Sequence, residues 1–187
     1  MSVTTIGSPA APRIKPTTMQ TFTGKLVDLA NFQPDDVRLP DIAHALSLIN
    51  RFTGHSKCPY SVAQHSVMVS NLTPPEHALW GLLHDASEAY LGDVATPLKN
   101  ALPGYRELEE RVQRTIAGVF GLSWPMPATV KEADLRALMA EKRDLIPGDH
   151  DWGIDVEPHC GPINPYCWTQ ARELFLARYR ELSRWGR

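Results

Sequence analysis

Apolar residues recur three and four positions apart along most of the chain from Pro40 onward. This is the spacing of helices that pack one face against a core. No stretch of useful length alternates apolar and polar residues as a half-buried strand would. The pattern therefore predicts an all-α fold, a compact single-domain bundle of about six helices.

Turn and capping residues set the limits of the predicted helices. Asp41 is a plausible cap for the first, Ser61 caps the second, and Thr73-Pro74-Pro75 opens the third, which Gly92 ends. The predicted helices cover residues 40–49, 61–72, 73–92, 98–119, 127–146 and 164 onward.

The segment ahead of these helices has a different composition. Residues 1–18 are small, polar and interrupted by proline, which favours a flexible N-terminal arm. The folded domain is expected over residues 19–187, and residues 21–37 have room for a short extended piece before the first helix.

Composition and charge narrow the function classes. The 187 residues are 43% hydrophobic and 21% charged, which is typical of one globular domain. A net charge of −2 disfavours a nucleic-acid polymer as partner but permits a small phosphorylated ligand. No apolar run approaches the length of a membrane span, and three cysteines without a CxxC spacing favour the reducing cytoplasm.

Four residues on three predicted helices are candidate metal ligands: His65, the adjacent pair His84 and Asp85, and Asp134. Each lies in an otherwise apolar stretch, where an unpaired carboxylate would be costly. Mixed nitrogen and oxygen ligands suit Mn, Fe, Co, Ni or Zn better than Ca. Four ligands on a six-coordinate ion would leave two positions for water and substrate, as in a hydrolytic site. Taken singly, either histidine could be an ordinary core residue and Asp134 a helix-surface residue, so only the joint pattern favours a metal.

The order of these residues resembles the HD superfamily of metal-dependent phosphohydrolases. Within that superfamily, the stretch HDASEAYLGDVATPLK is similar to the bacterial 5'-deoxynucleotidases and to the phage enzymes that remove triphosphate from dATP. The resemblance extends from about residue 41 to 145. It implies one divalent transition metal (Co, Mn or Zn), a free deoxynucleotide as substrate and a homo-oligomeric cytoplasmic enzyme.

The resemblance also implies two catalytic acids. Glu88 lies four residues after His84, which would place both on one helix face, where a carboxylate can orient a water or pass a proton. Asp93 follows Gly92 and matches an active-site acid of the family. Alternatively, Glu88 is an exposed helix residue and Asp93 is a turn-forming aspartate.

Three further positions are expected to bind substrate. Arg51 matches an arginine that faces phosphate and sugar, and its planar fork can hold two phosphate oxygens. Phe52 stands where the monophosphate-cleaving relatives carry tryptophan against the deoxyribose, and Lys99 matches a lysine on the polyphosphate. The alternative for Arg51 and Lys99 is a solvated surface cation, and the alternative for Phe52 is a core aromatic.

Hydrolysis of phosphate from 2'-deoxynucleotides is therefore the expected function. Monophosphates, giving deoxynucleoside and phosphate, and triphosphates, giving deoxynucleoside and triphosphate, both remain open. The alternatives are a cyclic-nucleotide or alarmone hydrolase, and a catalytically weak domain that senses a nucleotide or metal.

Overall fold

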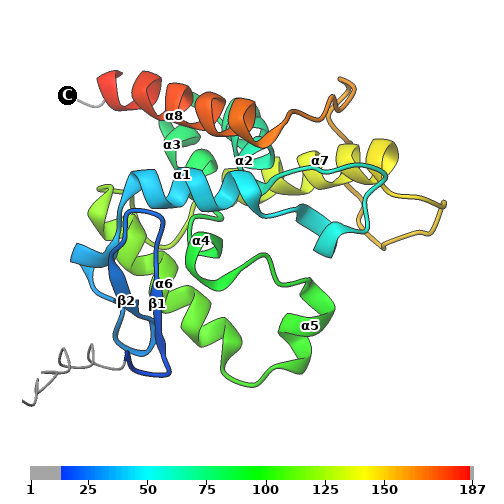
Figure 1. Cartoon of the computed structure of the whole chain (residues 1–187). Helices are drawn as coiled ribbons and strands as arrows, with labels where there is room; N and C mark the ends of the chain where they lie inside the picture. The colour runs from blue at the N-terminus through cyan, green and yellow to red at the C-terminus, as the bar shows by residue number, and fades with distance from the viewer. Residues whose placement is uncertain (1–13, 186–187) are drawn as a thin grey trace, which may run out of the picture.

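Helices make up most of the computed structural model, which describes residues 14–185 and confirms the predicted all-α class (Figure 1). The longer helices are α1 (Leu39–Leu48), α2 (Val62–Leu72), α6 (Tyr105–Val119), α7 (Ala128–Leu145) and α8 (Trp168–Trp185). The shorter ones are α3 (Ala78–Leu83), α4 (Glu88–Leu91) and α5 (Thr96–Ala101), with 3₁₀ turns η1 (Leu29–Asn31), η2 (Pro34–Asp36), η3 (Arg51–Gly54) and η4 (Pro75–His77).

A small antiparallel hairpin precedes the helices. Strand β1 (Thr18–Gln20) pairs with β2 (Leu26–Asp28), so the extended piece expected within residues 21–37 is present as β2. The predicted arm over residues 1–18 falls mostly on residues 1–13, which lie outside the described residues. Its last part is not an arm, because Thr17 donates a hydrogen bond to Asp28 and Thr18 begins β1.

Asp41 ties this hairpin to α1 rather than capping the helix. The helix begins two residues earlier, at Leu39. The buried Asp41 carboxylate accepts hydrogen bonds from the Thr21 hydroxyl at 2.9 Å and from the Thr23 backbone and hydroxyl at 2.6 and 2.9 Å. The prediction of Asp41 as a cap is therefore wrong.

Two long predicted helices are broken in the structure. The helix expected over residues 73–92 is divided into η4, α3 and α4, with a tight turn at residues 84–87. The helix expected over 98–119 is divided into α5 and α6, because Gly104 between them adopts a left-handed conformation with φ of 77°. The first break lies where the apolar spacing itself continues, whereas the pair Pro103-Gly104 marks the second in the sequence and was overlooked in favour of the spacing.

The last helix starts later than predicted. Asn164-Pro165 does not open α8, which begins at Trp168. The Gln64 side chain on α2 explains the delay: its amide donates to the Asn164 carbonyl and its oxygen accepts from the Tyr166 N–H, both at 2.8 Å. These two bonds keep the segment extended along α2.

Helix α2 lies at the centre of the bundle. It packs against α1, α3, α7 and α8, and α8 lies across the top of this group in Figure 1. Its N-terminus is capped as predicted, because the Ser61 hydroxyl accepts from the Gln64 N–H at 3.2 Å. The central position of α2 places its first turn, including His65, away from solvent.

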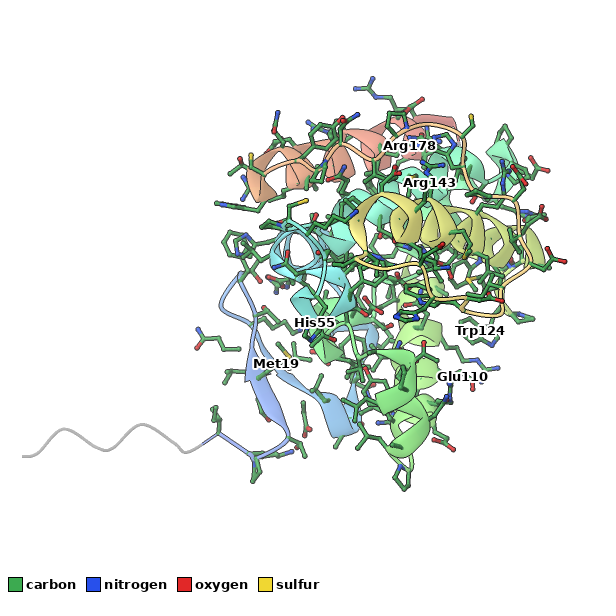
Figure 2. The ribbon with its side chains drawn as sticks, turned by 90° about the vertical axis from the view of Figure 1, so that its right-hand side faces the viewer. Met19, His55, Glu110, Trp124, Arg143 and Arg178 are labelled. Atoms are coloured by element: carbon green, nitrogen blue, oxygen red, sulfur yellow. The ribbon has the colours of Figure 1, made fainter. Side chains whose placement is uncertain are left out.

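The hairpin and α8 lie on different sides of the bundle. Figure 2 shows Met19 of the hairpin on the side away from α8, where Arg178 is labelled. Arg178 holds α8 on α2 through hydrogen bonds to the hydroxyl and carbonyl oxygens of Ser70, at 3.0 and 3.3 Å. Among residues 14–185, no helix has both the length and the apolar character needed to cross a bilayer.

Gly81 allows α3 to approach α2 closely, and its replacement should destabilise the fold. A Cβ there would lie 2.6 Å from the Thr73 hydroxyl oxygen and 3.0 Å from the Ser70 Cα. We expect Gly81→Ala to lower the free energy of unfolding by about 1–3 kcal/mol, the usual range for overpacking. Urea denaturation followed by circular dichroism measures this change.

Gly118→Ala in α6 is the matched control. No heavy atom lies within 4 Å of the added Cβ, so this change should leave stability the same or raise it by up to about 1 kcal/mol. Equal stability of Gly81→Ala and the parent would contradict the packing argument.

Candidate metal centre

Two imidazoles and a carboxylate from three elements meet in the interior. His65 comes from α2, His84 from the turn after α3, and Asp134 from α7. The His65 Nε2 lies 3.3 Å from the His84 Nε2 and 3.2 Å from the Asp134 Oδ1. The ligand atoms of all three lie within 4.8 Å of one another, so this group could hold a metal ion.

Asp85, the fourth predicted ligand, borders the same point. Its Oδ2 lies 3.1 Å from the His84 Nε2 and 3.6 Å from the His65 Nε2. Neighbouring ligands of a cation with bonds of about 2.0–2.2 Å are about 3–3.5 Å apart. The separations from the His65 Nε2 to His84 and to Asp134 are of this size, and the His84 Nε2 lies 3.9 Å from the Asp134 Oδ1. The structure thus groups His65, His84 and Asp134 as one possible metal site, with Asp85 at its border.

Both histidine rings present the same nitrogen to the centre. The His65 Nδ1 donates to the Glu141 Oε1 at 2.6 Å, and the His84 Nδ1 donates to the Gly81 carbonyl at 2.8 Å. Each Nε2 therefore directs its lone pair inward when the ring is neutral. Lone pairs and carboxylate oxygens crowded at one point require protons or a cation between them, and the donor set fits a divalent transition metal.

Charge in the centre shifts the pKa values of these groups strongly. Burial and Arg51 act to lower the pKa of His65, but the Glu141 carboxylate and hydrogen bonds to Asp134 and Glu141 outweigh them and raise it to about 9. Burial acts to raise the pKa of Asp85 and Asp134. The histidine partners nevertheless hold both below their usual value.

Glu141 on α7 belongs to this site and was missed by the sequence analysis. Its side chain is 0% exposed, and its second oxygen accepts from the Arg51 Nε at 3.0 Å. Burial acts to raise its pKa, yet the charges of Arg51 and His65 prevail and lower it. Its position seven residues after Asp134, on the same helix face, was the available signal.

Arg51 lies beside the centre as expected. One terminal nitrogen of its guanidinium is 3.6 Å from the Asp85 Oδ2. Phe52 and Thr53 after it have φ values of 57° and 52°, in the left-handed region that such residues rarely adopt. The Phe52 ring lies 5.3 Å from the guanidinium carbon and 6.3 Å from the ring of Trp152. The predicted arginine and its neighbouring aromatic thus share one wall.

Glu88 is buried next to this cluster, although the turn at residues 84–87 separates it from the helix of His84. Its Oε2 is buried and has no hydrogen-bond partner among residues 14–185. Burial, with the charges of Asp85 and Asp93, raises the pKa of Glu88 well above its usual value. The continuous helix expected here is wrong, yet the carboxyl group still lies in the electrostatic field of the centre.

Asp93 and Lys99 complete the predicted set. Burial raises the pKa of Asp93, while Arg51 opposes that shift. The Lys99 Nζ pairs with Glu109 and lies 3.7 Å from the Glu88 Oε1. Lys99 therefore reaches the edge of the cluster through Glu88 and contacts no metal-ligand candidate directly.

Comparison with known proteins yields two relatives. The uncharacterised Escherichia coli K12 protein YfdR is 40% identical over 169 residues, which cover 88% of this chain and 95% of YfdR. An uncharacterised Rhodobacter capsulatus protein is 38% identical over 122 residues, 60% of this chain and 62% of that protein. No family model matches the sequence.

The metal centre makes a direct binding prediction. We expect the metal-free protein to bind one equivalent of Mn²⁺, Co²⁺ or Zn²⁺ in isothermal titration calorimetry. His84→Ala should weaken that binding by more than the roughly 10–100-fold that is typical of a residue touching only a ligand. His150→Ala, at an exposed histidine outside the cluster, should bind like the parent. If His84→Ala binds metal as tightly as the parent, His84 is not a metal ligand.

The metal-free protein should lose stability as the pH rises from about 6.5 to about 9. A pKa raised from 6.5 to about 9 on folding means that protonated His65 stabilises the fold below pH 6.5 and that this contribution disappears through pH 9. The loss should be at most about 3 kcal/mol. The charged or titratable groups facing His65 are Glu141, Asp134, Asp85, His84 and Arg51.

Thermal unfolding at several pH values, with and without metal, measures this dependence. A bound cation takes the place of the proton on the His65 Nε2, so the decline should be absent in metal-saturated protein. A melting temperature that stays constant or rises over this range without metal contradicts the argument.

Proposed function

This chain belongs to the family of the Escherichia coli protein YfdR, and we propose that it is a divalent-metal-dependent phosphohydrolase of free 2'-deoxynucleotides. The convergence of four metal-ligand candidates carries the proposal. His65 and His84 with Asp85 and Asp134 form a mixed nitrogen and oxygen set beside a cation suited to phosphate.

In the proposed reaction, the metal would activate water and the side chains of the protein would bind the phosphoryl group. When bound, a Mn, Co or Zn ion would activate water near neutral pH and polarise a phosphoryl oxygen. Arg51 would hold the phosphoryl group through its terminal nitrogens, since its Nε is already engaged by Glu141. Its positive charge would stabilise the negative charge that develops during transfer.

Glu88 is suited to move a proton. Burial and the charges of Asp85 and Asp93 raise the pKa of Glu88, which favours its protonated form, and the Glu88 Oε2 has no competing partner among the described residues. It would donate that proton to the leaving oxygen, as a general acid. Asp93, whose pKa is also raised, would act near the sugar or leaving oxygen.

Substrate contacts follow from the same wall of the site. Phe52 is the proposed apolar surface for the deoxyribose. Lys99 would reach the outer phosphates of a triphosphate, which would require it to exchange its pairing with Glu109. The chain's net charge of −2 supports a small free nucleotide over a polymer.

A substrate panel tests the function. Deoxy- and ribonucleotides at the mono-, di- and triphosphate levels, with 3',5'-cyclic nucleotides and guanosine tetraphosphate, are incubated with Mn²⁺, Co²⁺ or Zn²⁺ and resolved by chromatography. We expect deoxynucleoside with phosphate or with triphosphate. Ribonucleotide binding without turnover would favour a sensor, and turnover of only cyclic nucleotide or alarmone would favour the other hydrolases.

Glu88→Gln should separate proton transfer from metal binding. The amide keeps the size of the side chain but has no acidic proton to give. We expect kcat to fall roughly 10²–10⁴-fold, the usual contribution of a general acid or base. Metal content, measured by mass spectrometry, should remain that of the parent. Glu110→Gln, at an exposed α6 residue visible in Figure 2, is the control, and a parent-like rate in Glu88→Gln would refute the role.

A further inference from the structure

We propose that Glu141 is a positioning residue that joins the metal centre to the phosphate-binding arginine, so that the two are assembled as one unit. This inference rests on the proposed function for the role of Arg51. Its metal-binding part stands on the geometry of His65 alone.

The two oxygens of Glu141 serve two different donors. Oε1 accepts from the His65 Nδ1 at 2.6 Å, and Oε2 accepts from the Arg51 Nε at 3.0 Å. The buried Tyr60 also acts to lower the pKa of this carboxylate. The group is thus fully buried and surrounded by donors.

These bonds decide which atoms face the centre. With its Nδ1 bonded to Glu141, His65 can offer only Nε2 to a metal. With its Nε bonded to Glu141, Arg51 is turned so that a terminal nitrogen lies 3.6 Å from Asp85. One carboxylate therefore sets the orientation of a metal-ligand candidate and of the cation beside it.

The backbone reinforces the same link. The Arg51 N–H donates to the Tyr60 carbonyl at 2.9 Å, and Asn50 and Ser61 form an isolated antiparallel bridge. Together these contacts anchor η3 at the start of α2, four residues before His65. Glu141, on α7, then bonds to both Arg51 of η3 and His65 of α2.

Only a carboxylate meets both demands. A glutamine of the same size has a single acceptor oxygen, so in either amide orientation one NH₂ group would face His65 or Arg51, which are themselves donors. Glu141→Gln should consequently disturb one or both partners without creating a cavity. A residue with a merely structural role would affect stability but not the intrinsic affinity of the centre.

Calorimetry on the full-length protein tests the inference without any turnover. Mn²⁺ is titrated into metal-free protein, and inorganic phosphate is titrated into protein saturated with Mn²⁺. We expect Glu141→Gln to weaken Mn²⁺ binding roughly 10–100-fold and to weaken phosphate binding as well. Arg51→Ala should weaken phosphate binding far more than Mn²⁺ binding. Glu132→Gln, the same change at an exposed residue of α7, should match the parent in both.

Parent-like Mn²⁺ affinity in folded Glu141→Gln would overturn the inference. If that variant does not fold, nitrogen NMR of the parent decides: the His65 signals, assigned with His65→Gln, should show a protonated Nδ1 in protein loaded with Zn²⁺. An unprotonated Nδ1 would overturn it. The Mn²⁺ affinity and the NMR signal involve neither nucleotide nor phosphate, so failure of the proposed function would leave both unchanged and would appear in the substrate panel and the phosphate titration.

Discussion

Buried charge where α2, α7 and the turn after α3 meet is the constraint on which this structure depends. The buried carboxylate of Glu141 and the partly buried carboxylates of Asp85 and Asp134 lie against the cation of Arg51 and the titratable ring of His65. Charges removed from water must be matched by partners, or the fold loses several kcal/mol. Each of these three carboxylates has a partner of this kind, because each lies within 4 Å of a histidine or arginine nitrogen. An added cation would further balance a group of donor atoms that are already close to one another.

Close packing brings the parts of this cluster together. Gly81 lets α3 approach α2, and its carbonyl accepts the Nδ1–H of His84, so one glycine serves both the helix contact and the ring orientation. The helix then ends in a tight turn, which turns Asp85 inward beside His84 and starts α4 at the buried Glu88. The turn that interrupts the helix at residues 84–87 therefore also places His84, Asp85 and Glu88 at the centre.

Membership of the YfdR family and the geometry of the centre bear on function in different ways. The relatives' names carry no activity, so the family relationship places the chain without explaining it. The proposed hydrolysis depends on the chemistry of the donor set, on Arg51 beside it and on the raised pKa of Glu88.

The sequence by itself determined the helical class, the cap at Ser61 and the grouping of His65, His84, Asp85 and Asp134. Apolar spacing and charges in apolar helices are local signals that need no partner to be visible. Only the tertiary structure decided that the helix before His84 ends in a turn, that Asp41 ties the hairpin to α1, and that Glu141 is buried. The pair Pro103-Gly104 already marks the break between α5 and α6 in the sequence. A glutamate followed by lysine and arginine near a helix end is typical of a solvated surface. It becomes a buried acceptor only because α2 and η3 bring His65 and Arg51 against that face of α7.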